Sequence, residues 1–346
     1  MNKRFVKNAE WSILIISLIL FAIGAVALYS CTQSTDFDEM KKQLVWFAIS
    51  VPILITFMVV DYNLISRASY VIYGIFIVLL IGVLFTPEIN GATSWFNIGA
   101  FSFQPGEFAK VFVVIFFSTI LCKFQQKGKE EINKPWKLMV VLISVALPVL
   151  LIAIQPDIGT AAAFLVATIF ILFVAGIDKK YIVVSVLLIV ILIPIIYMFI
   201  LPEHAKSRID VFLNPDLEPR GAGYNIIQSK LAVGAGKVFG MGILKGNQTQ
   251  LGFLYPKTTD FIFAVIGEEM GFIVSAVVVI LYILLLTKCI HVAKTAKDDL
   301  GSYIATGITR NIIFPCVRKY RNDNRITTNN RCSVTIYKLW RKFAYN

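Results

Sequence analysis

Three carboxylates stand where the sequence becomes most apolar. Asp260 comes directly before a long apolar run, and Glu268 and Glu269 lie inside that run. A carboxylate at the depth of the hydrocarbon core costs free energy, so such groups are usually paired or functional. At about 1.5 Å of rise per helical residue, the two glutamates lie about 12 Å along the helix from Asp260.

Asp260 has two interpretations from spacing alone. A carboxylate beside a polar loop stands where a general base could take a proton from a substrate. The sequence TTD before a helix also fits an N-cap, whose side chain accepts hydrogen bonds from the first free N–H groups. For Glu268 and Glu269, pairing inside a helical bundle and a role in a polar cavity both remain open.

Two further groups of polar residues offer a similar choice. Glu107 and Lys110 are three residues apart, which places them on one face of a helix. They form either an ion pair near the membrane surface or part of a polar cavity between helices. Asp157, in the sequence QPDIGTA, either caps the helix that follows or belongs to a site.

The composition is that of a membrane protein. The chain has 346 residues, of which 57% are hydrophobic and 16% are charged, and its mean hydropathy is +0.75. A soluble domain would have about 25% charged residues. Several apolar runs reach the length of about 20 residues that crosses a bilayer. The runs are continuous rather than alternating, which predicts an all-α polytopic membrane protein.

The apolar runs predict eight complete spans. Lys3, Arg4 and Lys7 precede the first span, which indicates a cytoplasmic N-terminus, and most loop Lys and Arg residues then fall on the cytoplasmic side. The long loop 202–260 therefore lies outside, together with Asp260. The predicted spans are 11–29, 43–60, 68–86, 107–122, 137–154, 158–176, 181–201 and 261–287. The predicted cytoplasmic loops are 61–67, 123–136, 177–180 and 288–299.

The outer loop contains the sequence GYNIIQSKLAVGAGKVFGMGILKG. Its apolar residues are spaced as in a surface-lying amphipathic helix, and a glycine-rich turn follows. A phosphate-binding loop would need glycine where Leu231 stands, which disfavours an ATP-driven pump. The five cysteines and two histidines have no spacing that supports a disulfide framework or a zinc site.

Four segments together resemble the SEDS family (shape, elongation, division and sporulation). They are NGATSWFNIGAFSFQPGEFAK, QPDIGTA, GAGYNIIQSKLAVGAGKVFGMGILKG and TDFIFAVIGEEMGF. The resemblance extends from the first span to about Ile308, and the sequence VIGEE is closer to elongation-type than to division-type members. It implies a ten-span fold and a peptidoglycan glycosyltransferase that polymerises lipid II at the outer face of the cytoplasmic membrane. It also implies a class B penicillin-binding protein as partner, and no nucleic-acid partner.

The resemblance also assigns residues. The family's essential aspartate falls on Asp260, and the Glu and Lys of its QPxExxK motif fall on Glu107 and Lys110. Trp95, Asp157 and Arg208 stand at positions that the family pattern favours. Asp260 would be the base for the acceptor sugar hydroxyl, alone or with a divalent cation. The charge of the departing lipid-linked pyrophosphate would be met by Arg208, Arg220, Lys237 or such a cation.

The resemblance stops where spans nine and ten should follow. Residues 309–346 instead form a basic tail with nine Lys or Arg and one Asp, or +8 of the net charge of +12. Back-translated from Phe314 to Lys342 and read one nucleotide later, this tail can encode FHVFENIGMTIGLLPITGVPLPFISYGG, which resembles the missing ending. We therefore expect a SEDS domain at 1–308 and an out-of-frame tail without evolved function at 309–346. If the tail is real, we expect an abortive ninth span and little or no polymerase activity.

Two other classes of function fit a many-span bundle with internal polar residues. A lipid II flippase would move the substrate without joining it, so it would make no glycan from substrate already on the outer side. A non-catalytic scaffold would hold a penicillin-binding protein and would keep its effect on cell shape after substitution of Asp260.

Overall fold

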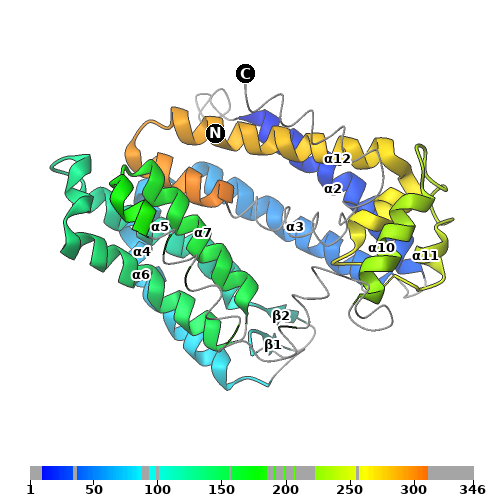
Figure 1. The fold of residues 1–346 in the computed structure, drawn as a ribbon, viewed down its shortest axis with the longest axis horizontal. Coiled ribbons are helices and arrows are strands. Elements are labelled where there is room, and N and C mark those ends of the chain that lie inside the picture. Colours follow the sequence, from blue (N-terminus) through cyan, green and yellow to red (C-terminus); the bar gives the residue numbers. More distant parts are fainter. Residues whose placement is uncertain are drawn as a thin grey trace. The chain divides into compact units, whose positions relative to one another are not determined.

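The protein is described by a computed structural model, in which long helices dominate (Figure 1). The residues that it describes are 10–33, 37–87, 93–98, 101–155, 157–184, 223–254 and 257–310, with single residues at 187, 191, 198 and 206. Within these ranges, five helices are long and apolar enough to cross a bilayer. They are Trp11–Thr32, Asp38–Val59, Tyr62–Phe85, Pro135–Ile154 and Ile262–Thr295. The polytopic helical architecture expected from the apolar runs is therefore confirmed.

The helices follow the predicted spans closely at most positions. Their bounds are α2 Trp11–Thr32, α3 Asp38–Val59, α4 Tyr62–Gly82, α5 Pro105–Phe124, α6 Pro135–Ile154, α7 Ile158–Val174, α10 Tyr224–Ala235, α11 Asn247–Gln250 and α12 Ile262–Thr295. Two short 3-10 helices are η2 Val83–Phe85 and η3 Lys129–Asn133. Most of the predicted seventh span, 181–201, lies outside the described residues.

Local chemistry explains where several helices begin. Pro105 and Pro135 stand at the first positions of α5 and α6, where a missing N–H costs nothing. Asp61 caps α4, since its carboxylate accepts a hydrogen bond from the N–H of Asn63. This cap starts α4 before the predicted residue 68, so most of the expected loop 61–67 is helical. Likewise α12 continues to Thr295, into the expected loop 288–299.

The predicted outer loop 87–106 contains β-structure, which an all-α expectation did not include. Strands β1 (Phe96–Ile98) and β2 (Phe101–Phe103) pair antiparallel, with Phe96 opposite Phe103 and Ile98 opposite Phe101. Aromatic and β-branched residues favour strands, and here they alternate with Asn97 and Ser102. The hairpin directly precedes α5, which carries Glu107 and Lys110.

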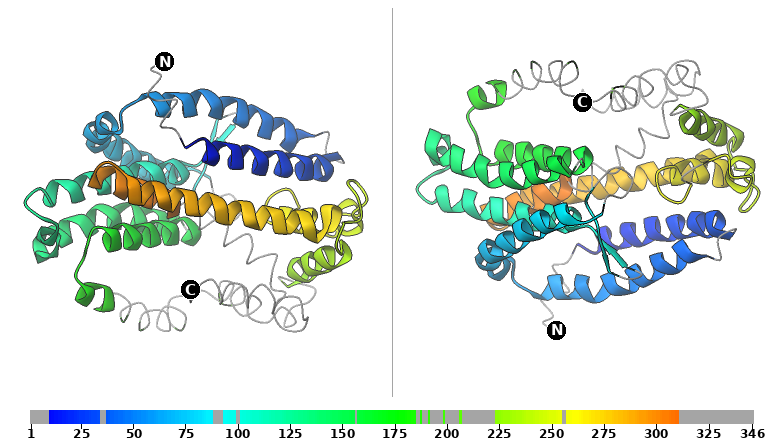
Figure 2. Two further views of the ribbon diagram at one scale, coloured as in Figure 1. Left: turned by 90° about the horizontal axis from the view of Figure 1, so that it is seen from above. Right: turned by 90° about the horizontal axis from the view of Figure 1, so that it is seen from below.

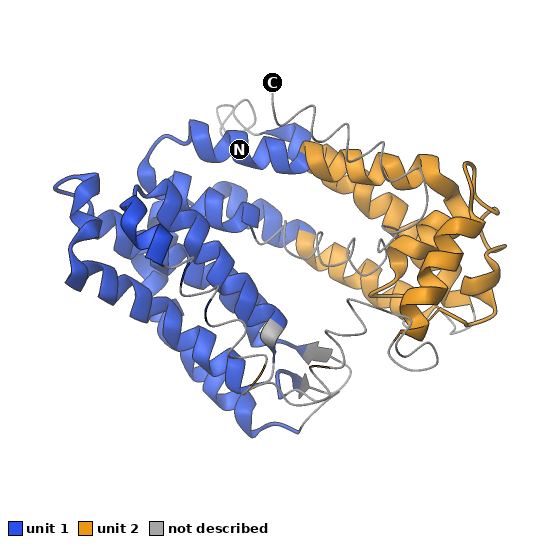
Figure 3. Cartoon of the chain, viewed as in Figure 1, with its two compact units in different colours: residues 1–13, 51–192, 285–314 blue, residues 14–50, 193–284, 315–346 orange. Residues whose placement is uncertain are grey.

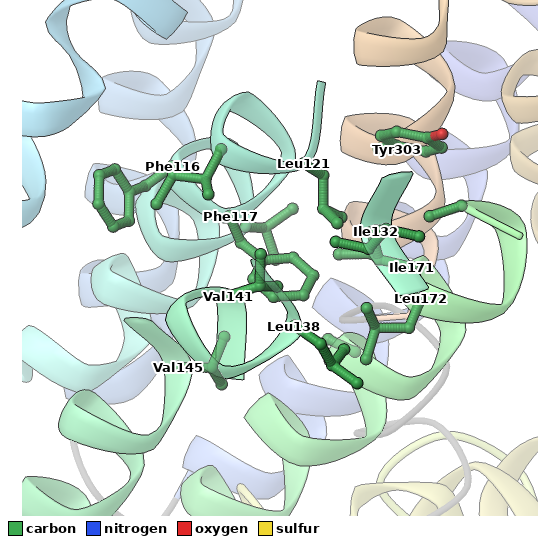
Figure 4. Packing of buried hydrophobic residues seen from close by; sticks show 14 residues of the cluster. Phe116, Phe117, Leu121, Ile132, Leu138, Val141, Val145, Ile171, Leu172 and Tyr303 are labelled. Atoms are coloured by element: carbon green, nitrogen blue, oxygen red, sulfur yellow. The ribbon is translucent and has the colours of Figure 1, made fainter. Parts of the chain in front are cut away.

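The chain forms two compact units (Figure 3). Unit 1 comprises residues 1–13, 51–192 and 285–314, and unit 2 comprises residues 14–50, 193–284 and 315–346. In unit 1, helices α4 to α7 pack side by side, as both views of Figure 2 show. Its core lies between α5, α6 and α7 and includes Phe117, Val141 and Ile171 (Figure 4).

A helical segment at 299–310 completes the core of unit 1. Asp298 caps it, accepting a hydrogen bond of 2.7 Å from the N–H of Gly301. Tyr303 is fully buried, and its hydroxyl donates to Gln125 Oε1 at 2.7 Å. Gln125 in turn donates to the carbonyl of Ala175 at 2.7 Å. This buried network fixes the start of the expected ninth span against α5 and α7.

Candidate functional site

Asp260 lies in the turn that leads into α12. Its side chain is exposed, whereas the next residue, Phe261, is 7% exposed and packs against Leu254, Ala264 and Val265. The first backbone bond of α12 runs from the N–H of Ala264 to the carbonyl of Phe261. Among the residues that the structure describes, none donates a hydrogen bond or forms an ion pair with Asp260. Asp260 therefore does not cap α12, and its carboxylate has no hydrogen-bond or ion-pair partner within the described ranges.

The turn before Asp260 is held from two sides. Lys257 Nζ donates to the carbonyl oxygen of Thr249 at 3.0 Å. Cys31, at the end of α2, donates from Sγ to the carbonyl of Lys257 at 3.7 Å. With Phe261 anchored in the core on the other side, Asp260 stands on a short segment that is fixed at both ends.

Glu268 is completely buried and binds the turn α11. Its Oε1 accepts from the N–H of Gln248 at 2.7 Å. Its Oε2 accepts from the N–H of Thr249 at 3.0 Å and from Thr249 Oγ1 at 2.7 Å. Three donors thus offset the desolvation of the carboxylate, and charge-assisted bonds of this kind are the strong ones.

Glu269 is 2% exposed and binds two elements through one oxygen. Its Oε1 accepts from Ser30 Oγ at 2.7 Å and from Gln250 Nε2 at 3.0 Å, while its Oε2 accepts no hydrogen bond from any described residue. Gln250 also donates to Ser30 Oγ at 2.9 Å. The two glutamates therefore join α12 to α11 and α2, which favours structural pairing over a water-facing cavity.

Helix α12 is broken at Gly271, whose φ is 80° and ψ is −176°. The glycine-rich segment 237–242 supplies the hydrogen bonds that the break removes from the helix. The N–H groups of Phe272 and Ile273 donate to the carbonyls of Lys237 and Val238, at 3.0 and 3.3 Å. The N–H groups of Met241 and Gly242 donate to the carbonyls of Glu268 and Glu269, at 2.9 and 3.0 Å. A break at this depth is tolerated because protein groups satisfy it.

The predicted helix and glycine-rich turn of the outer loop are both present in unit 2, without the apolar buried face that was expected of the helix. Helix α10 spans Tyr224–Ala235, but it buries Ser229 and Ala232, whereas Leu231 is exposed. Figure 1 shows α10 and α11 beside the N-terminal end of α12. The turn after α10 approaches α12 closely because it is rich in glycine.

Glu107 and Lys110 form an ion pair on α5, in unit 1. Lys110 Nζ lies 2.6 Å from Glu107 Oε1, and the lysine side chain is 12% exposed while the glutamate side chain is 52% exposed. Lys110 also lines a small pocket with otherwise mostly apolar walls, among them Val113, Phe117 and Phe164. The expected ion pair is therefore formed, whereas the pocket beside Lys110 is mostly apolar and is not the expected polar cavity.

The other candidates of unit 1 lie at helix and strand ends. Asp157 caps α7, because its carboxylate accepts from the N–H and the hydroxyl of Thr160, at 3.0 and 2.8 Å. It also accepts from Gln104 Nε2 at 2.9 Å. Trp95 is half-buried just before β1. Arg208 and Arg220 lie outside the described residues.

The described residues supply no ready-made metal site. In the part of the chain that the structure covers, no three His, Cys, Asp or Glu side chains gather closely enough to hold an ion. A divalent cation at Asp260 would therefore need further ligands from outside the described residues.

The spacing of four glycines in the sequence is a signal for the close contact at the break of α12. Gly236 and Gly240 are four residues apart, and so are Gly267 and Gly271. Such small-xxx-small pairs, best known from membrane helices, allow two segments to approach at backbone distance. The partners Ser30, Thr249 and Gln250 had no comparable signal, because each is a common polar residue far from the glutamates in sequence.

The chain is similar to known proteins over most of its length. It matches a family model described as a cell cycle protein (FtsW, RodA and SpoVE) over residues 10–318. Peptidoglycan glycosyltransferase MrdB of Escherichia coli (strain K12) is 32% identical over 302 residues, which cover 86% of this chain and 79% of that protein. Stage V sporulation protein E of Bacillus subtilis (strain 168) is 35% identical over 309 residues, covering 86% and 82%.

A solved structure has the same fold. It is described as "Structural coordination of polymerization and crosslinking by a peptidoglycan synthase complex", and its chain superposes with a TM-score of 0.76. The sequences are 22% identical, and the match covers 91% of this chain and 88% of that one. Given the family model and the relatives above 30% identity, the chain belongs to the FtsW/RodA/SpoVE family of cell cycle proteins.

Proposed function

We propose that this chain is a peptidoglycan glycosyltransferase of the elongation type, which polymerises lipid II at the outer face of the cytoplasmic membrane. The observation that carries the proposal is Asp260, an exposed carboxylate without a bonding partner among the described residues, on a turn fixed by Lys257 and Phe261. Relatives named peptidoglycan glycosyltransferase support the same chemistry.

Asp260 would act as the general base. The acceptor sugar hydroxyl attacks the anomeric carbon of the donor and gives its proton to the carboxylate. The bond between that carbon and the pyrophosphate oxygen breaks, and the lipid-linked pyrophosphate departs with the electron pair. Lys237 is exposed on the glycine-rich turn of the same unit and could meet this negative charge, as could Arg208 and Arg220.

The test is polymerisation of lipid II by protein carrying D260N. Asparagine keeps the size of the side chain but cannot take the proton, so glycan synthesis should fall at least about 100-fold, which is the usual contribution of a general base. Substrate supplied directly in detergent separates a polymerase from a flippase, because a flippase makes no glycan from it. Wild-type synthesis by the D260N protein at equal abundance would contradict the proposal.

A class B penicillin-binding protein is the partner that we propose. A protein of the same fold comes from a structure described as a peptidoglycan synthase complex in which polymerisation and crosslinking are coordinated. A scaffold without chemistry would bind such a partner too. Co-purification that survives D260N while glycan synthesis is lost would fit an enzyme in a complex. Co-purification without glycan synthesis, even by the unsubstituted chain, would favour the scaffold.

We also propose that the native reading frame ends close to Ile308. One face of the helical segment 299–310 is buried and carries Tyr303, Gly307 and Arg310. The guanidinium of Arg310 therefore lies on the same buried face as the core residue Tyr303. Cations at such positions are costly in a membrane protein. Read one nucleotide later, the codon that takes two bases from Arg310 and one from Asn311 has the form GNA, which encodes Gly, Ala, Val or Glu.

The frame proposal is tested on the gene and on the protein. Sequencing of codons 295–346 should show a one-nucleotide insertion or deletion relative to a frame that encodes spans nine and ten. A polypeptide with the restored frame should polymerise lipid II far faster than the chain with the basic tail. Efficient synthesis by the tailed chain, with its mass verified intact, would contradict the proposal.

A further inference from the structure

The segment that carries Asp260 is connected to a buried carboxylate through one turn. Glu268 binds the backbone N–H groups of Gln248 and Thr249, and the carbonyl of Thr249 accepts from Lys257 Nζ at 3.0 Å. Lys257 stands three residues before Asp260. Each contact in this series belongs to unit 2, and each is a direct hydrogen bond.

The two glutamates differ in whether both of their carboxylate oxygens accept hydrogen bonds. Both oxygens of Glu268 accept hydrogen bonds, with three donors in total. Glu269 accepts two hydrogen bonds, both at Oε1, and its Oε2 accepts none from the described residues. In E269Q, the side-chain oxygen can stay at the Oε1 position, which accepts both hydrogen bonds. The NH₂ group then takes the Oε2 position, which accepts none from the described residues. In E268Q, both positions face hydrogen-bond donors, so the NH₂ group must replace an acceptor at one of them.

We infer that Glu268 is a positioning residue for Asp260, which it serves by holding the turn 247–250 that in turn holds Lys257. The inference rests on the proposed function, because Asp260 is the base of that reaction. Glu268 itself touches no reacting atom. It is completely buried, so its role is to fix the geometry of the outer end of α12.

The first test is amide hydrogen exchange of the purified chain in lipid nanodiscs. In E268Q, exchange at Gln248, Thr249 and the segment 257–261 should accelerate about tenfold or more, because a charged acceptor of backbone donors is lost. In E269Q, the matched control, exchange at these amides should stay within about twofold of wild type. Unit 1 amides around Tyr303 report in the same samples whether the protein is folded.

A second variant covers the case in which E268Q does not fold. T249V removes one of the three donors to Glu268 and leaves the two backbone donors in place. Exchange at 257–261 should then rise about threefold, in line with the loss of one neutral donor. If exchange at 257–261 is unchanged in E268Q, or in T249V where E268Q is unfolded, the inference is overturned. Equal effects of E268Q and E269Q would overturn it too.

The second test is lipid II polymerisation by the frame-restored polypeptide. E268Q should lower kcat about tenfold and leave KM within about twofold, because a displaced base slows the chemical step more than substrate binding. The exposed E130Q in η3 is the control for unchanged activity. Faster exchange with unchanged kcat would overturn the positioning role. If D260N keeps activity while E268Q changes exchange, the proposed function fails and the contact series stands.

Discussion

The main chain of Gly240 lies directly against the main chain of Gly271. A methyl group built on Gly271 would collide with the Gly240 nitrogen, and one built on Gly240 would collide with the carbonyl of Glu269. Both glycines also have a positive φ, of 84° and 80°. The glycine-rich segment 237–242 of the outer loop thus packs with its main chain against the break at Gly271. This contact fixes the part of α12 before the break, which directly follows Asp260 in the sequence.

Replacement of Gly240 or Gly271 by alanine should strongly lower the stability of the protein. G240A and G271A each add a clash and a strained φ, so each should lower stability by about 3 kcal/mol or more. G234A is the matched control, since Gly234 lies in α10 with open space around its Cβ position, and alanine there should stabilise the helix by about 1 kcal/mol. Thermal unfolding in detergent measures all three. Equal melting temperatures for G234A and G240A would contradict the contact.

Asp157 should behave as a cap. D157A removes the acceptor for Thr160 and Gln104 and should cost about 0.5–2 kcal/mol of stability. D157N keeps an acceptor at the cap and should cost much less. Thermal unfolding of the two variants checks this order. If D157N abolishes polymerisation while stability is unchanged, Asp157 has a role in the site beyond the cap.

Substitution of the two partners of the ion pair on α5 should have unequal effects on stability. E107Q leaves the lysine ammonium of Lys110 beside apolar walls without its counter-ion, so stability should fall by about 1 kcal/mol. K110M places an apolar side chain of similar length there and should be close to neutral in stability. The double variant should recover most of the loss caused by E107Q. Additive losses in this cycle would show that the two side chains do not interact.

Glu131, in the 3-10 helix η3 of unit 1, provides a test by pH. Hydrogen bonds from Lys134 and Lys137 lower the pKa of its carboxyl from an ordinary value of 4.5 to about 2. A carboxyl with a lowered pKa stabilises the folded state above its unfolded pKa, and this contribution is lost as pH falls toward its folded pKa. The difference in melting temperature between wild type and E131Q should therefore stay constant from pH 5 to about pH 8 and shrink below pH 4.5. A constant difference down to pH 3 would contradict the bonds.

Sequence patterns predicted the helical architecture because continuous apolar runs leave few alternatives in a bilayer. The same patterns could not predict partners that are far apart in sequence. Asp157 was recognisable as a cap, because its partner Thr160 is local. Glu268 was recognised only as a costly carboxylate, since Thr249 and Gln248 reach it through the fold of the outer loop. The hairpin before α5 was missed because its two strands are shorter than an ordinary strand signal.

The measurement that tests Asp260 most directly compares lipid II polymerisation by the frame-restored polypeptide with and without D260N. Both proteins are purified at equal abundance, their melting temperatures are matched, and glycan is resolved by chain length. The expected result is long glycan from the unsubstituted protein and at least about 100-fold less from D260N. Glycan at the same rate from both proteins would show that Asp260 is not the base.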